Sequence, residues 1–63
     1  MNGGPLSCIY RAYEHGELVV TGRLTLDALP EVGDVVRLNN RPYVVHAIDY
    51  DAGEPVLSLE PQE

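Results

Sequence analysis

The chain has 63 residues, ten of them Asp or Glu and four of them Arg, with no Lys, so its formal net charge is −6. A protein held to DNA by electrostatics neutralises about 6–10 phosphates, and an anionic membrane repels an acidic protein, so the composition excludes nucleic acid and membrane partners. The single Cys excludes an internal disulfide. One Cys and two His in the whole chain are too few ligands for a zinc site, so we expect no metal and no cofactor.

No apolar run reaches the ~20 residues that cross a membrane, and the N-terminus lacks the basic and apolar stretches of a signal peptide. We therefore expect a cytoplasmic protein. Residues 1–5 and 61–63 contain little that a fold would bury, so we predict a disordered N-terminus and a loose C-terminus. Residues 6–60 are expected to form a single β-barrel domain, because a chain of this length supports only one small core.

Residues 17–26 alternate most cleanly, with Leu18, Val20, Leu24 and Leu26 on the face that we expect to be buried, and the other segments between turn residues are also rich in strand-forming residues. The predicted strands are residues 6–13, 17–26, 34–38, 41–50 and 54–60. The connection at residues 27–33 has room for at most one 3₁₀ turn, near residues 27–30. Asn39-Asn40 suits a two-residue hairpin loop, since Asn tolerates positive φ, and this loop pairs Val36 with Tyr43.

Two hairpin tips repeat one phrase, at residues 13–17 and 50–54, in which Tyr and an acid precede Gly and Glu. The phrase predicts three-residue loops in which Gly takes the left-handed conformation. A two-residue loop in the first hairpin would place Arg11 opposite Val20 on the buried face, an uncompensated charge that costs several kcal/mol. The three-residue loop is therefore preferred in both hairpins.

Five short strands joined mostly by tight turns have two edges to protect, which favours closure. The fold class predicted is all-β: a five-stranded antiparallel meander that closes into a small barrel. The segment from Val32 to Val45, with Gly33-Asp34, a strand, a tight turn and a second strand, resembles small SH3-like barrels. This resemblance implies the fold only; the chain lacks the Trp and the Ala-Leu-Tyr-Asp-Tyr segment of peptide-binding SH3 domains.

The predicted register places apolar residues on both faces of the last three strands. One interpretation is a bend or bulge near His46 and Ala47 that turns part of the fourth strand inward to close the barrel. The other is an exposed patch that binds a protein partner or a second copy of the chain, which makes the protein a non-enzymatic interaction module. The residues of this predicted patch are Val35, Val44, Ile48, Tyr50 and Val56.

The alternative function is an acidic inhibitor or nucleic-acid mimic, of the kind small viral proteins provide, that blocks a basic groove. Its surface is formed by Glu14, Glu17, Asp49, Asp51 and Glu54. No acid lies in a recognisable motif with a nucleophile, and a small closed barrel leaves little space for a pocket, so neither an enzyme nor a small-molecule substrate is expected.

Overall fold

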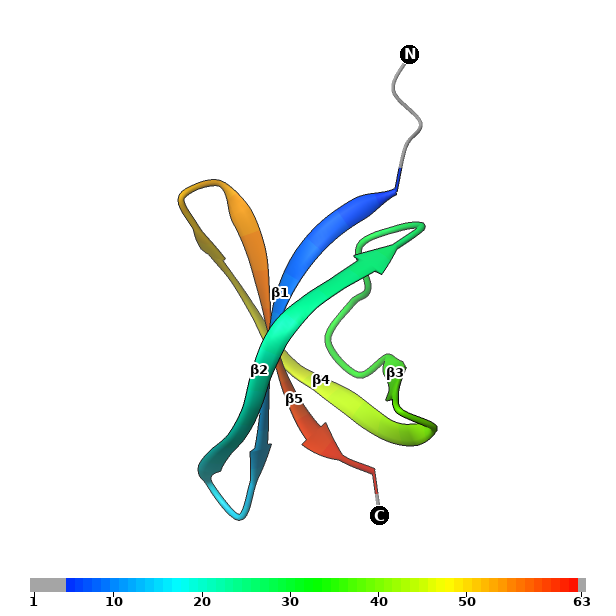
Figure 1. Ribbon diagram of the computed structural model, residues 1–63, viewed down its shortest axis with the longest axis vertical. Coiled ribbons are helices and arrows are strands. Elements are labelled where there is room, and N and C mark those ends of the chain that lie inside the picture. Colours follow the sequence, from blue (N-terminus) through cyan, green and yellow to red (C-terminus); the bar gives the residue numbers. More distant parts are fainter. Residues whose placement is uncertain (1–4, 63) are drawn as a thin grey trace.

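The computed structural model describes residues 5–62, which form one curled five-stranded sheet (Figure 1). The strands are β1 (Leu6–Glu14), β2 (Glu17–Leu26), β3 (Val35–Leu38), β4 (Arg41–Asp51) and β5 (Glu54–Pro61). Residues 5–62 contain no helix, and hence none long and apolar enough to cross a membrane. The all-β prediction and the approximate position of each strand are confirmed.

The strand order is β2-β1-β5-β4-β3, which makes the sheet mixed. β1 and β5 run parallel at its centre, while the other three neighbouring pairs are antiparallel. The prediction of a fully antiparallel meander was therefore wrong. The two long hairpins, β1–β2 and β4–β5, meet through β1 and β5, and these two strands run in the same direction.

The sheet also does not close into a barrel, contrary to the prediction. β2 and β3 are its two edges and do not pair with each other, so the molecule is a half-barrel with one open side. β3 has only four residues, whereas β2 has ten, so β3 offers few backbone groups with which β2 could pair to close the barrel. The loop between β2 and β3 runs along this open side (Figure 1). The SH3-like resemblance extends only to a small, strongly curled sheet.

The β1–β2 hairpin has a two-residue loop instead of the predicted three-residue loop. Glu14 pairs with Glu17, and both His15 and Gly16 have positive φ, as a type I′ turn requires. The charge conflict that argued against this loop is removed by a β-bulge at Val19, after which Arg11 lies opposite Thr21 and stays exposed. The bulge was not foreseen because nothing in the local sequence marks it.

The β4–β5 hairpin also combines a two-residue loop with a β-bulge. Asp51 pairs with Glu54 around a two-residue loop, and a bulge at His46 separates the Val45–Leu59 pair from the Ala47–Ser58 pair. The predicted three-residue loop was wrong here too, but the bend proposed near His46 and Ala47 is present. The bulge brings Ile48 opposite Leu57, on the concave face of the sheet.

The central turn follows the prediction. Asn39 and Asn40 both have positive φ, and Val36 pairs with Tyr43. In the loop between β2 and β3 no 3₁₀ turn is formed; instead the amide of Asp34 donates to the carbonyl of Glu31 at 2.9 Å, and its carboxylate accepts from the Glu31 amide at 2.9 Å. These two bonds hold the loop in place at the start of β3.

The core fills the concave side of the half-barrel. Its fully buried members come mainly from the central strands, and Tyr10, Leu24, Leu26 and Ile48 pack against it from the sides. On the β2 side the Tyr10 ring covers Gly22, where an added Cβ would lie only 3.0 Å from the ring. The buried cluster consists of Cys8, Ala12, Val36, Leu38, Tyr43, Val45, Leu57 and Leu59.

The last strand extends one residue further toward the C-terminus than predicted. Pro61 is the last residue of β5 and pairs with Tyr43, and the Gln62 amide donates to the Pro42 carbonyl at 3.1 Å. Glu63 and residues 1–4, for which disorder was predicted, lie outside the described residues.

Candidate functional site

The open side of the half-barrel contains an apolar groove of about 630 Å³. One wall is the second half of β2, the floor is the loop that follows it, and the other wall is β3. The groove is thus bounded by the two strands that have a free edge. Its lining residues are Leu24, Thr25, Leu26, Ala28, Leu29, Pro30, Asp34, Val35, Val36 and Arg37.

The side chains reach the groove for simple local reasons. Leu24 and Leu26 alternate with exposed Thr25 along β2, so both point to the concave face and pack at the margin of the core. Leu29 is 37% exposed on the loop, and Val35 is 49% exposed because it alternates with the buried Val36 on β3 and faces away from the core. The groove is therefore the uncovered margin of the hydrophobic core.

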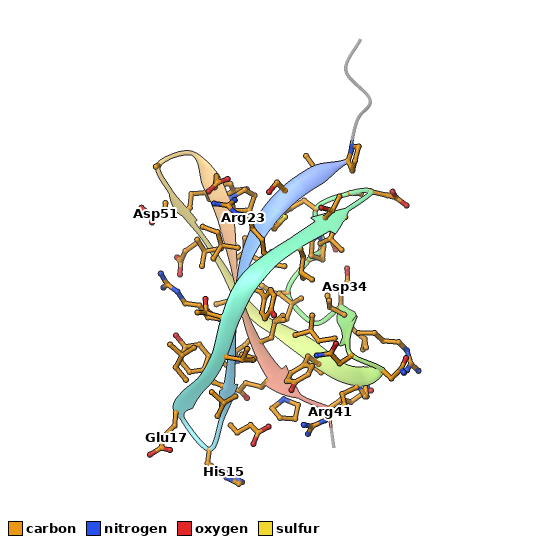
Figure 2. All side chains as sticks on the ribbon, in the orientation of Figure 1. His15, Glu17, Arg23, Asp34, Arg41 and Asp51 are labelled. Atoms are coloured by element: carbon orange, nitrogen blue, oxygen red, sulfur yellow. The ribbon has the colours of Figure 1, made fainter. Side chains whose placement is uncertain are left out.

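The charges around the groove are mostly negative. Asp34 lines it, and Asp27 and Glu31 are exposed on the same loop, whereas Arg37 is the one cation among the residues that line it. The Asp34 carboxylate is engaged by the Glu31 amide, and Figure 2 shows Asp34 on the open side of the molecule. The lining itself contains one acid and one base, Asp34 and Arg37, so the excess of acid comes from Asp27 and Glu31 on the adjoining loop.

The residues of the predicted patch are divided between the faces of the sheet: Val35 pairs with Val44 on the outer face, which Val56 shares, whereas Ile48 lies on the core side. Ile48 packs against the core, and Val56 is 3% exposed on the other face of the sheet, where it pairs with Asp49. Val44 is half-buried, and Tyr50 is 63% exposed near the tip of the β4–β5 hairpin. Only Val35 lines the groove.

The five acids of the alternative surface are divided between two hairpin tips. Glu14 and Glu17 are cross-strand neighbours at the tip of β1–β2. Asp51 and Glu54 are cross-strand neighbours at the tip of β4–β5, and Asp49 lies two residues before Asp51. The tips lie at opposite ends of the molecule, as the labels of Glu17 and Asp51 show in Figure 2.

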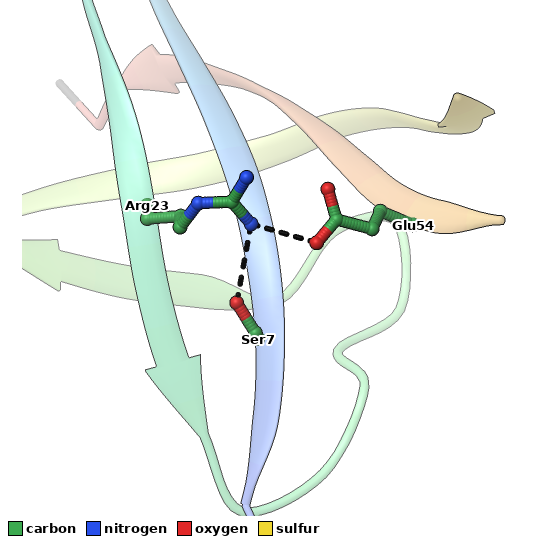
Figure 3. Close-up of polar contacts among 3 residues, drawn as sticks. All are labelled: Ser7, Arg23 and Glu54. Atoms are coloured by element: carbon green, nitrogen blue, oxygen red, sulfur yellow. Dashed lines mark hydrogen bonds and ion pairs between the residues drawn. The ribbon is translucent and has the colours of Figure 1, made fainter. Parts of the chain in front are cut away.

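Two of these acids form ion pairs. An Arg23 guanidinium nitrogen lies 2.7 Å from Glu54 Oε2 and 3.3 Å from Ser7 Oγ, so this contact links β2, β1 and β5 (Figure 3). The hydrogen bond to Glu54 and its charge raise the pKa of Arg23 further above its ordinary value. Arg41 lies 3.7 Å from Glu14 and also stacks over the Tyr43 ring, with 5.8 Å between the guanidinium carbon and the ring centroid.

A second hollow of about 460 Å³ lies at the β1–β2 tip and is more polar. Glu14, His15, Arg41 and Glu60 line it, but the charged pair Glu14–Arg41 already bridges it. Within residues 5–62 no three His, Cys, Asp or Glu side chains lie close enough to hold a metal ion. Cys8 is fully buried, and burial, with a smaller contribution from the charge of Glu54, raises the pKa of its thiol.

The sequence reasoning missed most of the groove. It assigned Leu24 and Leu26 to the core of a closed barrel, and it treated residues 27–33 as a connection only. The one local signal was the Leu29-Pro30 pair, two apolar residues within an otherwise polar connection. Comparison with protein-family models, with curated proteins and with solved structures found no match to the chain.

Proposed function

We propose that the protein is an interaction module that binds a segment of a protein partner, or of a second copy of itself, in the groove between β2 and β3. The single observation that carries this proposal is the apolar groove at the open side of the half-barrel, bounded by two free strand edges. Apolar surface next to unpaired backbone groups is what extended peptides bind, since main-chain hydrogen bonds supply affinity and side-chain pockets supply specificity.

The size of the chain supports the same proposal. A domain of about 60 residues buries little core and has a small margin of stability, so covering the side chains at the open side contributes both affinity and stability. Leu29 and Val35 are the large apolar residues of the lining that are still exposed. The acidic mimic has less support, because its acids lie at two distant tips and two of them form ion pairs.

The test is selection of a displayed library of random twelve-residue peptides on the purified chain. Enriched peptides should bind the wild-type protein and lose about tenfold or more in affinity, or ~1.4 kcal/mol, on Val35→Asp and on Leu29→Asp. Both positions are exposed, so neither variant should unfold; circular dichroism verifies this.

Val32→Asp is the matched control. Val32 is 63% exposed and lies on the same loop, but it does not line the groove, so this variant should bind like the wild type. If no peptide is enriched, or if the enriched peptides bind Val35→Asp as tightly as the wild type, the groove is not a binding site. Sedimentation of the chain alone shows whether a second copy already occupies it.

A further inference from the structure

The directions of the strands restrict how a segment can enter the groove. β2 is antiparallel to β1, β1 is parallel to β5, and β4 and β3 then alternate, so β2 and β3 run in opposite directions. A strand inserted between them is antiparallel to one and parallel to the other. β2 has ten residues and β3 four, and antiparallel pairing is the more stable kind, so the segment gains most by running antiparallel to β2.

The bulge determines which part of β2 is free to pair. At Val19 it disturbs the regular ladder near the hairpin tip, which is a common way of protecting an edge strand. Beyond it, residues 21–26 pair regularly with β1 and leave their outer backbone groups unpaired. This is the half of β2 whose Leu24, Thr25 and Leu26 line the groove, so the free edge and the apolar lining coincide.

The charges indicate the chemistry of the segment. Asp27, Glu31 and Asp34 lie on the loop along the groove, against the single Arg37, and the chain as a whole has a charge of −6. A second copy would bring the same net charge and the same acidic loop to the interface. A basic segment is attracted by the net charge and by the acidic loop. Opposite charges also speed its encounter with the groove and fix the register in which it binds.

Resting on the proposed function, we infer that the occupant is an extended segment of a basic protein partner, which adds as a strand antiparallel to residues 21–26 of β2 and closes the half-barrel. Strand pleating then requires apolar side chains at alternate positions, facing Leu24, Leu26 and Val36, and basic side chains between them. A segment of about six residues is long enough to cover this edge.

The probe is a synthetic peptide of about six residues in which Lys and Val alternate, with capped ends, and its counterpart in which Glu replaces Lys. The Lys peptide should bind at least tenfold more tightly than the Glu peptide, with affinity that falls as salt is added. On binding, the alternate amides of residues 21–26 that face away from β1 should exchange with solvent at least tenfold more slowly, as measured by NMR. A Lys peptide with N-methylated alternate amides should lose this protection.

Matched variants test the charge argument. Asp27→Lys with Glu31→Lys should reverse the preference between the two peptides. Glu17→Lys with Asp51→Lys changes the net charge equally, but at the hairpin tips, and should preserve the preference for Lys. Asp34 is left unchanged because its carboxylate holds the loop.

The outcomes separate this inference from the proposed function. If library-selected peptides bind in the groove but residues 21–26 gain no protection, strand addition is wrong and the binding module remains. If both peptides bind equally, or the tip variants reverse the preference, the basic partner is wrong. If sedimentation shows a dimer that Val35→Asp dissociates, the occupant is a second copy and this inference is overturned.

Discussion

The two long hairpins of this protein share a turn and differ in their surroundings. Both β1–β2 and β4–β5 have a two-residue loop in which the two central residues have positive φ, and both contain one bulge. In β4–β5 the bulge turns Ile48 onto the core. In β1–β2 the bulge lies on the edge strand, beside Leu18, Val19 and Val20, which are each 42–52% exposed.

The difference shows that the turn determines which residues pair at the hairpin tip. The position of the bulge determines which side chains face the core beyond it. β5 has a neighbour on each side, so both its edges are paired. β2 has a neighbour on one side only. The same local design therefore yields one hairpin, β4–β5, in which both strands have a neighbour on each side, and another, β1–β2, whose second strand is an edge that borders the candidate binding groove.

The largest expected difference between the hairpins is in the free energy of unfolding after Leu57→Ala and Leu18→Ala. Leu57 is fully buried, so its truncation should cost about 2–5 kcal/mol, whereas Leu18 is 52% exposed and should cost under about 0.5 kcal/mol. Urea denaturation followed by circular dichroism measures both. If Leu57→Ala is largely unfolded, Leu57→Val should still cost more than Leu18→Ala; equal losses would contradict the placement of the two hairpins.

The turns should respond equally. Gly16 and Gly53 have φ of 81° and 84°, and an added Cβ at either would contact nothing within 4 Å. Gly16→Ala and Gly53→Ala should therefore each cost only the left-handed strain, about 1–2 kcal/mol. The midpoint of urea unfolding compares them. A much larger loss for one variant would mean that the tips are not equivalent.

A smaller effect distinguishes the edge hairpin, because Tyr10 covers Gly22 across the strands. Gly22→Ala should destabilise the wild type by about 1 kcal/mol, since the ring must move. In a Tyr10→Ala background the same change should be neutral or stabilising, because Ala restricts the unfolded chain. A double-mutant cycle on unfolding free energies tests this; additive effects would show that the ring does not contact this position.

The smallest expected effect concerns the ion pair that joins the hairpins. Glu54→Gln removes the partner of Arg23, and the pair is well exposed, so the loss of stability should be slight and should vanish at about 1 M salt, where charges are screened within ~3 Å. Glu60→Gln, an exposed acid on the same strand, is the control. A loss that persists at high salt would show that Glu54 contributes by packing.

Local residue chemistry determined the strands and the turns. Apolar stretches bounded by turn residues placed all five strands within a few residues, and Asn39-Asn40 predicted its loop and register. Gly16 and Gly53 marked the other two turns, although not their length. These features were predictable because each depends on the φ preference or side-chain period of a few adjacent residues.

Tertiary structure alone decided the bulge at Val19, the parallel pairing of β1 with β5, and the open side with its groove, and at His46 it chose between two interpretations that the sequence left open. A bulge shifts the phase of a strand by one residue, so it is selected by which side chains the whole sheet buries and not by its own sequence. For the same reason the predicted patch shares only Val35 with the lining of the groove: which apolar residues border the open side depends on how the whole sheet curls.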